Sequence, residues 1–203
     1  MKKGLTEIIY VLDRSGSMGH LTGDTIGAYN AYLDEQKKFD GETKITTVLF
    51  DDKYELLYNG EKIENAYLDH EKYYVRGMTA LYDAVGKTIL DVGHRLSVTS
   101  ENERPEKVIF IITTDGYENA SKEFTQKKVK EMIEHQSNKY SWEFMFFGAN
   151  IDTAAVADEI GVNPRMAYDF EASEKGIGRM MECCCAATAR IRENKPKKSF
   201  FKR

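Results

Sequence analysis

The ten residues IIYVLDRSGS, at positions 8–17, join a buried strand to a loop rich in oxygen ligands. The run Ile8–Leu12 is continuously apolar and rich in β-formers, a pattern typical of a strand covered on both faces. Asp13 follows at once, and Ser15 and Ser17 come after it at alternate positions. In an open α/β sheet, the ligand lies outside the carboxyl ends of the parallel strands. This stretch therefore predicts an α/β sheet with a polar site where its first strand ends.

The rest of the chain alternates between strand and helix signals. The link Asp51–Lys53 allows only an antiparallel hairpin, because a parallel return needs a longer crossover. The other strands are separated by helical patterns, which predicts a largely parallel sheet with helices on both faces and one antiparallel strand near an edge. We expect strands at Ile8–Leu12, Lys44–Phe50, Tyr54–Tyr58, Lys107–Thr114, Trp142–Phe147 and Ala167–Asp169. We expect helices near Thr22–Phe39, Leu81–Val92, Val129–Ile133, Ala154–Ile160 and Ser173–Arg192.

Composition places the chain among globular proteins. It has 203 residues, of which 41% are hydrophobic and 31% are charged, and we expect one domain over residues 1–193. Residues 194–203 (NKPKKSFFKR) are basic, and we expect a disordered tail there. The formal net charge of −4 gives no global basic field, which argues against nucleic acid as a partner. Because no stretch has the length and apolarity of a signal peptide or a membrane span, we expect a cytoplasmic protein without a membrane partner.

The three cysteines are adjacent, at Cys183–Cys185, within the last predicted helix. Adjacent cysteines cannot build a disulfide framework, which fits a reducing compartment. Successive residues of a helix point about 100° apart, so the three thiols cannot face one metal ion. We interpret them as small, partly buried helix residues.

A second carboxylate follows another predicted buried strand. Asp115 comes directly after Lys107–Thr114, and Gly116 follows it. If the two strands are neighbours, Asp13 and Asp115 converge at one edge of the sheet, and a bound cation relieves their repulsion. Carboxylate and hydroxyl oxygens are hard ligands that suit Mg²⁺, Ca²⁺ or Mn²⁺, and these segments hold no His or Cys to recruit zinc. The residues alone therefore predict a site for a hard divalent cation.

Three segments together resemble the von Willebrand factor A domain, in its bacterial intracellular form, and match the metal-ion-dependent adhesion site of that family. They are Asp13-x-Ser15-x-Ser17, Gly77–Ala84 (GMTALYDA) and Thr114-Asp115-Gly116, in the order and spacing of that site. The resemblance covers residues 6–169. It implies a Rossmann-like, three-layer α/β domain with a mostly parallel six-stranded sheet in the order 3-2-1-4-5-6 and one antiparallel edge strand. Strands 1 and 4 are neighbours in that order.

The resemblance also implies a ligand set and a mode of action. In that family the serine and threonine hydroxyls contact the metal, the aspartates bind it directly or through water, and a Glu or Asp of a partner protein often completes the coordination. Carried over residue by residue, the metal ligands are Asp13, Ser15, Ser17, Thr79 and Asp115. The expected cofactor is Mg²⁺, with Mn²⁺ or Ca²⁺ as alternatives. We place six residues at the rim that meets the partner: Arg14, Met18, His20, Met78, Tyr117 and Glu118.

Other interpretations of these residues stay open at this stage. Ser15, Ser17 and Thr79 can instead cap helices and turns. A metal beside two aspartates can activate water, so a Mg²⁺-dependent hydrolase or phosphoryl-transfer enzyme is the alternative function, with His20 as a candidate general base. The family resemblance also permits an accessory subunit of an ATPase machine.

Two further polar pairs have plain interpretations. We interpret Asp51 and Asp52 as hairpin turn residues. Glu118 and Asn119 either orient the metal ligands or belong to an ordinary polar loop.

Overall fold

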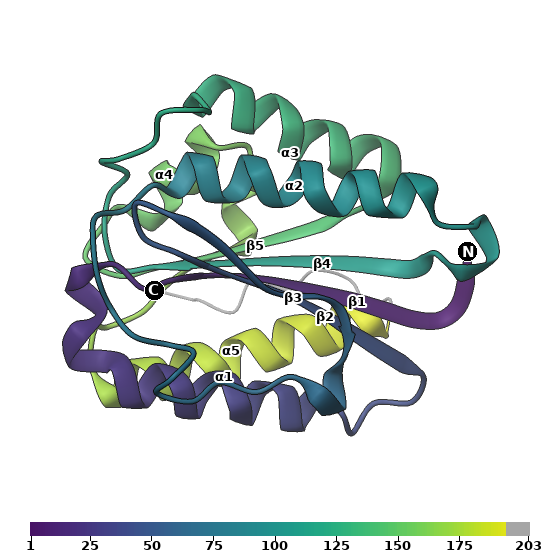
Figure 1. Ribbon diagram of the computed structural model, residues 1–203, viewed down its shortest axis with the longest axis horizontal. Coiled ribbons are helices and arrows are strands. Elements are labelled where there is room, and N and C mark those ends of the chain that lie inside the picture. The colour runs from purple at the N-terminus through teal and green to yellow at the C-terminus, as the bar shows by residue number, and fades with distance from the viewer. Residues whose placement is uncertain (194–203) are drawn as a thin grey trace.

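The computed structural model describes residues 1–193 and shows one sheet between two layers of helices (Figure 1). Its six strands have the order β3-β2-β1-β4-β5-β6, and all neighbours are parallel except β2 and β3. The predicted fold class, sheet order and antiparallel edge strand are therefore confirmed. The strands are β1 (Lys2–Asp13), β2 (Glu42–Phe50), β3 (Tyr54–Lys62), β4 (Pro105–Thr114), β5 (Glu143–Gly148) and β6 (Ala167–Asp169).

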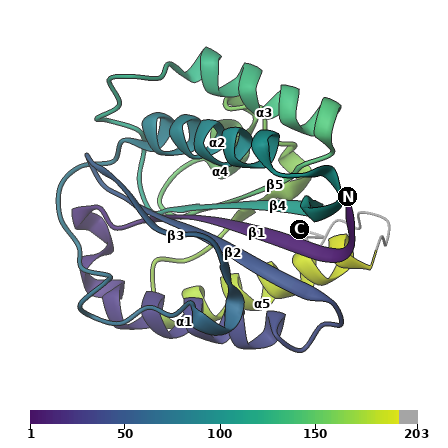
Figure 2. The same ribbon diagram turned by 45° about the vertical axis from the view of Figure 1, so that its right-hand side comes forward.

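The helices cover both faces of the sheet. They are α1 (Thr22–Gln36), α2 (Leu81–Val98), α3 (Gln126–Tyr140), α4 (Thr153–Glu159) and α5 (Glu174–Arg192). Helices α2, α3 and α4 lie on one face and α1 and α5 on the other, as two views show (Figure 1, Figure 2). Because both faces are shielded from water, the central strands are apolar on both sides and form the core.

The register of the central strands brings the two predicted site loops together. Leu12 of β1 lies opposite Thr113 of β4, so both strands end at the same edge of the sheet. Asp13 is the last residue of β1 and Asp115 directly follows β4, so both lie at that edge on neighbouring strands. This is the convergence that the sequence predicted.

Strand β1 begins earlier than its apolar pattern indicates. It starts at Lys2 rather than Ile8, and the first three of its residues are exposed. Backbone pairing holds this extension, since Lys2 N–H donates to the carbonyl of Arg104 at 2.8 Å. Helix α1 ends at Gln36 rather than near Phe39. Hydrophobic periodicity detects neither of these backbone features.

The remaining expectations concern the end of the chain. Cys184 is buried and Cys183 and Cys185 are half-buried in α5, all as free thiols. Burial raises the pKa of Cys183 and of Cys185 to about 11, which disfavours their thiolate forms. The basic tail predicted at 194–203 lies outside the described residues. Within residues 1–193, no helix combines the length and the apolar character needed to cross a membrane.

Candidate metal centre

The loop after β1 brings its two serine hydroxyls together. The Oγ atoms of Ser15 and Ser17 lie 3.1 Å apart. Asp13 fixes the start of the loop, because its Oδ1 accepts a hydrogen bond from the backbone N–H of Ser15 at 2.6 Å. A 3-10 helix, Gly16–Leu21, continues the chain and buries Met18 beneath the loop. The alternating positions of Ser15 and Ser17 therefore place both hydroxyls on the same side of the loop.

The loop after β4 and the segment before α2 meet these serines. Ser17 Oγ donates a hydrogen bond to Oδ1 of Asp115 at 2.5 Å. A Cβ placed on Gly116 would lie 3.8 Å from Oγ1 of Thr79 and 4.0 Å from Oγ of Ser17. The hydroxyls of Ser17 and Thr79 therefore border one small space, and the glycine leaves that space open. The carboxylate of Asp115 adjoins it.

Asp13 lies buried at the base of the site. Burial raises the pKa of its carboxyl to about 6, although hydrogen bonds from Thr114 and Ser15 favour the charged form. The nearby charge of Asp115 raises it further. Burial likewise raises the pKa of Asp115, partly offset by the hydrogen bond from Ser17. Two desolvated carboxylates in one site carry an electrostatic cost that a cation would remove.

The residues present fit a hard divalent cation. Oδ2 of Asp115 is buried and has no hydrogen-bond partner among the described residues, and a buried acceptor of this kind costs free energy until a donor or a cation meets it. Across residues 1–193 there is no group of three or more His, Cys, Asp or Glu side chains suited to a metal ion. Binding here has to rest on hydroxyls with two carboxylates, a set that suits Mg²⁺ or Mn²⁺. The five-ligand assignment stays a prediction.

Asn119 and Glu118 hold the loop that carries Asp115. The sequence left open whether they have such a role or belong to an ordinary polar loop. Oδ1 of Asn119 accepts from the backbone N–H of Thr79 at 2.9 Å, and the backbone N–H of Asn119 donates to the carbonyl of Thr79 at 2.9 Å. Glu118 accepts hydrogen bonds from the backbone N–H groups of Tyr82, at the start of α2, and Ser121. Asn119 thus clamps a predicted ligand, and Glu118 is occupied in capping.

The predicted rim is exposed at three of its six positions. Met78 and Tyr117 each expose 56% of their surface, and His20 is also exposed. Nδ1 of His20 lies 3.0 Å from the carbonyl oxygen of Ser17, so the ring sits against the site loop. Glu118 is half-buried by the contacts just described.

Arg14 and Met18 are buried instead, which corrects their predicted place at the rim. Met18 packs inward because the 3-10 turn after Ser15 points it at the core. Arg14 points inward because it pairs with Asp51, and Asp51 is correspondingly buried rather than a plain turn residue.

Gly77, two residues before Thr79, occupies a position that admits no side chain. Its φ is +67°, and a Cβ there would lie 2.0 Å from Oδ1 of Asp52. We expect Gly77→Ala to lower the free energy of unfolding by about 2 kcal/mol, because the left-handed conformation alone costs about 1–2 kcal/mol for a residue with a Cβ. Urea denaturation measures this, with Gly23→Ala as the control, since nothing lies within 4 Å of a Cβ at Gly23. Equal stabilities of the two variants would refute the expectation.

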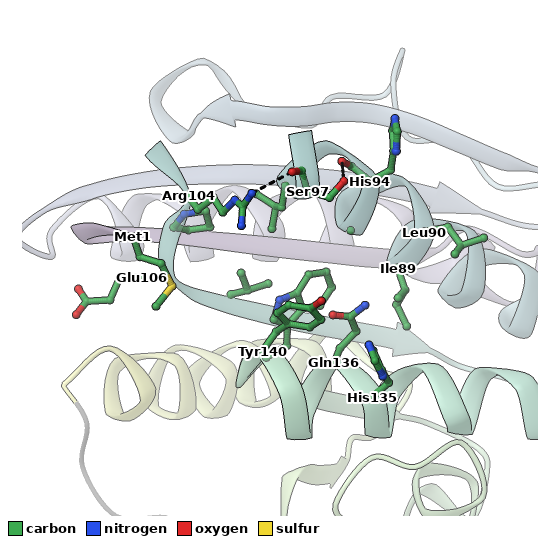
Figure 3. A pocket seen from close by; sticks show the side chains of 15 residues that line it. Met1, Ile89, Leu90, His94, Ser97, Arg104, Glu106, His135, Gln136 and Tyr140 are labelled. Atoms are coloured by element: carbon green, nitrogen blue, oxygen red, sulfur yellow. Dashed lines mark hydrogen bonds between the residues drawn. The ribbon is translucent and has the colours of Figure 1, made fainter. Parts of the chain in front are cut away.

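A separate cavity of about 500 Å³ lies at the other end of the sheet (Figure 3). Its wall includes His94 and Ser97 from α2, His135 and Tyr140 from α3, and Glu106 at the start of β4. None of the five predicted metal ligands lines it. The metal site and this cavity are therefore independent features.

Comparison with known proteins places the fold. No protein-family model and no curated protein sequence matches the chain. Proximal thread matrix protein 1 from the mussel byssus, solved with a zinc-occupied metal-ion-dependent adhesion site, aligns with 91% of this chain at 17% identity and a TM-score of 0.63. The manganese-loaded TRAP protein of Plasmodium vivax aligns with 89% of this chain at 15% identity and a TM-score of 0.60. The ArnB paralog VWA2 of Sulfolobus acidocaldarius aligns with 97% of this chain at 16% identity and a TM-score of 0.56.

The chain therefore has the fold of a von Willebrand factor A domain. It spans 46% of the mussel protein, 73% of the Plasmodium protein and 46% of the archaeal one. A likeness at these identities establishes the fold alone.

Proposed function

We propose that this chain is a protein-binding module that holds Mg²⁺ at Asp13, Ser15, Ser17, Thr79 and Asp115. The observation that carries the proposal is the unpartnered, buried Oδ2 of Asp115 beside the hydroxyl of Ser17. When bound, the cation supplies a Lewis-acidic point of attachment for a partner's carboxylate. Mn²⁺ or Ca²⁺ would suit the same oxygens. The zinc and manganese in the mussel and Plasmodium structures support a divalent cation without choosing among these.

The chain's own residues divide this work. The hydroxyls of Ser15, Ser17 and Thr79 are neutral, so they offer oxygen ligands without cancelling the charge that attracts an acidic partner. Asp13 serves both the loop and the metal, because Ser15 N–H and Thr114 Oγ1 each use one lone pair of its two oxygens and the remaining lone pairs are left for the cation. It therefore fixes the loop from below, while Ser17 is exposed at the surface where a partner arrives.

The exposed side chains around the site support one kind of partner. Met78, one residue before Thr79, and the ring of Tyr117, two residues after Asp115, are exposed apolar groups. We propose a protein partner that presents a Glu or Asp with apolar groups beside it, in the cytoplasm. A capture experiment from the native source tests this. The partner is expected to bind with Mg²⁺ present and to elute with EDTA, and capture that is indifferent to EDTA would exclude the proposal.

The exposed rim gives a prediction that separates partner binding from metal binding. The double variant Met78→Ser with Tyr117→Ser is expected to weaken partner binding by roughly tenfold, because it removes two exposed apolar contacts. Mg²⁺ affinity is expected to stay within about twofold, since neither side chain is a predicted ligand. Surface plasmon resonance with the captured partner and calorimetry with Mg²⁺ measure the two effects. Unchanged partner affinity would show that the rim is elsewhere.

A further inference from the structure

Arg14 lies within the segment Asp13–Ser17, but the proposed metal site gives it no role as a ligand. It is completely buried and is the largest of the fully buried side chains. A buried guanidinium is costly unless it is paired and hydrogen-bonded. Its Nε donates to Oδ2 of Asp51 at 3.0 Å, and its Nη1 lies 2.8 Å from Oε2 of Glu55. The ring of Tyr74 covers it, with the centroid 5.3 Å from Cζ.

Asp51 is the centre of this network, and it is also fully buried. Its Oδ2 accepts a second hydrogen bond, at 2.6 Å, from Nε of Arg76. Its Oδ1 accepts from the backbone N–H of Lys53, and its carbonyl accepts from the backbone N–H of Ala80 at 2.9 Å. Burial raises the pKa of Asp51, but the hydrogen bonds from Arg76 and Lys53 and the charge of Arg14 outweigh burial and hold it below its ordinary value. Asp51 is therefore ionised and fully engaged.

The network connects the two segments that carry hydroxyl ligands. On one side, Arg14 lies between Asp13 and Ser15 in the chain. On the other side, Arg76 precedes Thr79 by three residues, and its backbone N–H donates to the carbonyl of Arg14 at 3.0 Å. Three backbone hydrogen bonds, Arg76 to Arg14, Gly16 to Gly77 and Ala80 to Asp51, run alongside the ion pairs.

The charges of the network cancel. Arg14 and Arg76 carry two positive charges, and Asp51 and Glu55 carry two negative ones. A neutral network beside the site can fix its geometry without repelling a cation. Isolated arginines so close to the serine loop would oppose cation binding.

We propose that the buried Arg14–Asp51 ion pair is a positioning device that sets the spacing between the serine loop and the Thr79 segment for the metal ion. This inference rests on the proposed function. Neither residue is a predicted ligand, so each acts through the ligands that it holds. Groups that orient metal ligands from behind change metal affinity by about 10-fold to 100-fold when they are lost.

The test is calorimetric titration of Mn²⁺ into the full 203-residue chain, at a temperature well below the melting temperature of each variant. Arg14→Met is expected to raise the Kd at least tenfold, and Arg14→Lys, which keeps the charge, to give an intermediate value. The matched control is Arg95→Met. Arg95 pairs with the buried Glu7 on β1, which lies six residues before Asp13, so its loss breaks a similar pair away from the site.

The outcomes are distinct. Arg95→Met is expected to lower the melting temperature while the Kd stays within about twofold of the unsubstituted chain. If Arg14→Met changes the Kd no more than Arg95→Met does, the pair only stabilises the fold and the inference is wrong. If Arg14→Met fails to fold, Arg76→Gln replaces a 36% exposed side chain and tests the same network, with an expected rise of about threefold or more. If the unsubstituted chain binds no metal ion, the proposed function is wrong, and the inference that rests on it is wrong as well.

Discussion

Replacing both Ser15 and Ser17 with alanine is expected to weaken Mg²⁺ binding by at least about 100-fold while leaving the fold intact. Their hydroxyls contact each other, and the loss of the Ser17 hydroxyl removes the only hydrogen bond to Oδ1 of Asp115 found among the described side chains. The carboxylate would lose its orientation, and two predicted ligands would be gone. Isothermal titration calorimetry measures the affinity, and circular dichroism reports the fold.

Ser137→Ala is the matched control for this double variant. Ser137 lies on α3, away from the three site segments, and is partly exposed. Its loss is expected to leave the Kd unchanged. The ligand assignment would be contradicted by a double variant that binds Mg²⁺ as tightly as this control does.

Replacing Asp13 with asparagine is expected to make the chain more stable than the unsubstituted one in EDTA and less stable than it in saturating Mg²⁺. Burial raises the pKa of Asp13 from 3.8 to about 6. The folded, metal-free protein therefore holds this proton more tightly than the unfolded chain, and the associated stability is lost as the pH rises from about 4 through about 6. At pH 7 the buried charge costs about 1 to 3 kcal/mol. Asparagine carries no charge, and its Nδ2 can donate to Thr114 Oγ1, so the variant is expected to be more stable in EDTA by that amount.

Saturating Mg²⁺ is expected to invert that order. A ligand at about 1,000 times its Kd stabilises the folded state by about 4.1 kcal/mol, which exceeds the cost of the buried charge, and only the unsubstituted chain keeps the charge that favours the cation. Urea denaturation at pH 7, with EDTA and then with Mg²⁺, measures both stabilities. Asp34→Asn, an exposed position on α1, is the control and is expected to behave like the unsubstituted chain. An asparagine variant that is less stable in EDTA would contradict the burial argument.

The sequence predicts the features that depend on hydrophobic runs and on adjacent polar residues. The continuous runs Ile8–Leu12 and Lys107–Thr114 predict two central strands, and the short link Asp51–Lys53 predicts the hairpin. Polar residues immediately after two such strands predict that Asp13 and Asp115 converge. The full sheet order came from the family resemblance, because strand pairing across a sheet leaves no mark in the periodicity of a single strand.

The sequence could not reveal which polar residues of the site face inward. Arg14 lies between two predicted ligands in the chain, and arginine is usually a surface residue. It is buried because Asp51, 37 positions away, supplies its counter-charge. In the sequence, Asp51 resembles an ordinary turn residue. Its role becomes visible only in the structure, where Arg14 and Arg76 both donate to its carboxylate. The sequence of the loop does not show whether Asn119 supports a ligand, and its reciprocal hydrogen bonds with Thr79 show that it does. These roles depend on partners that are distant in the chain, which no local pattern encodes.

Anomalous X-ray diffraction from a crystal of the chain grown with Mn²⁺ tests the central claim most directly, since it locates the ion without assuming its ligands. We predict one dominant peak within coordination distance of the hydroxyls of Ser15 and Ser17, between the loops that follow β1 and β4. A dominant peak anywhere else, for example between His94 and His135, or no peak at saturating Mn²⁺, would contradict the claim that these two loops share a metal ion.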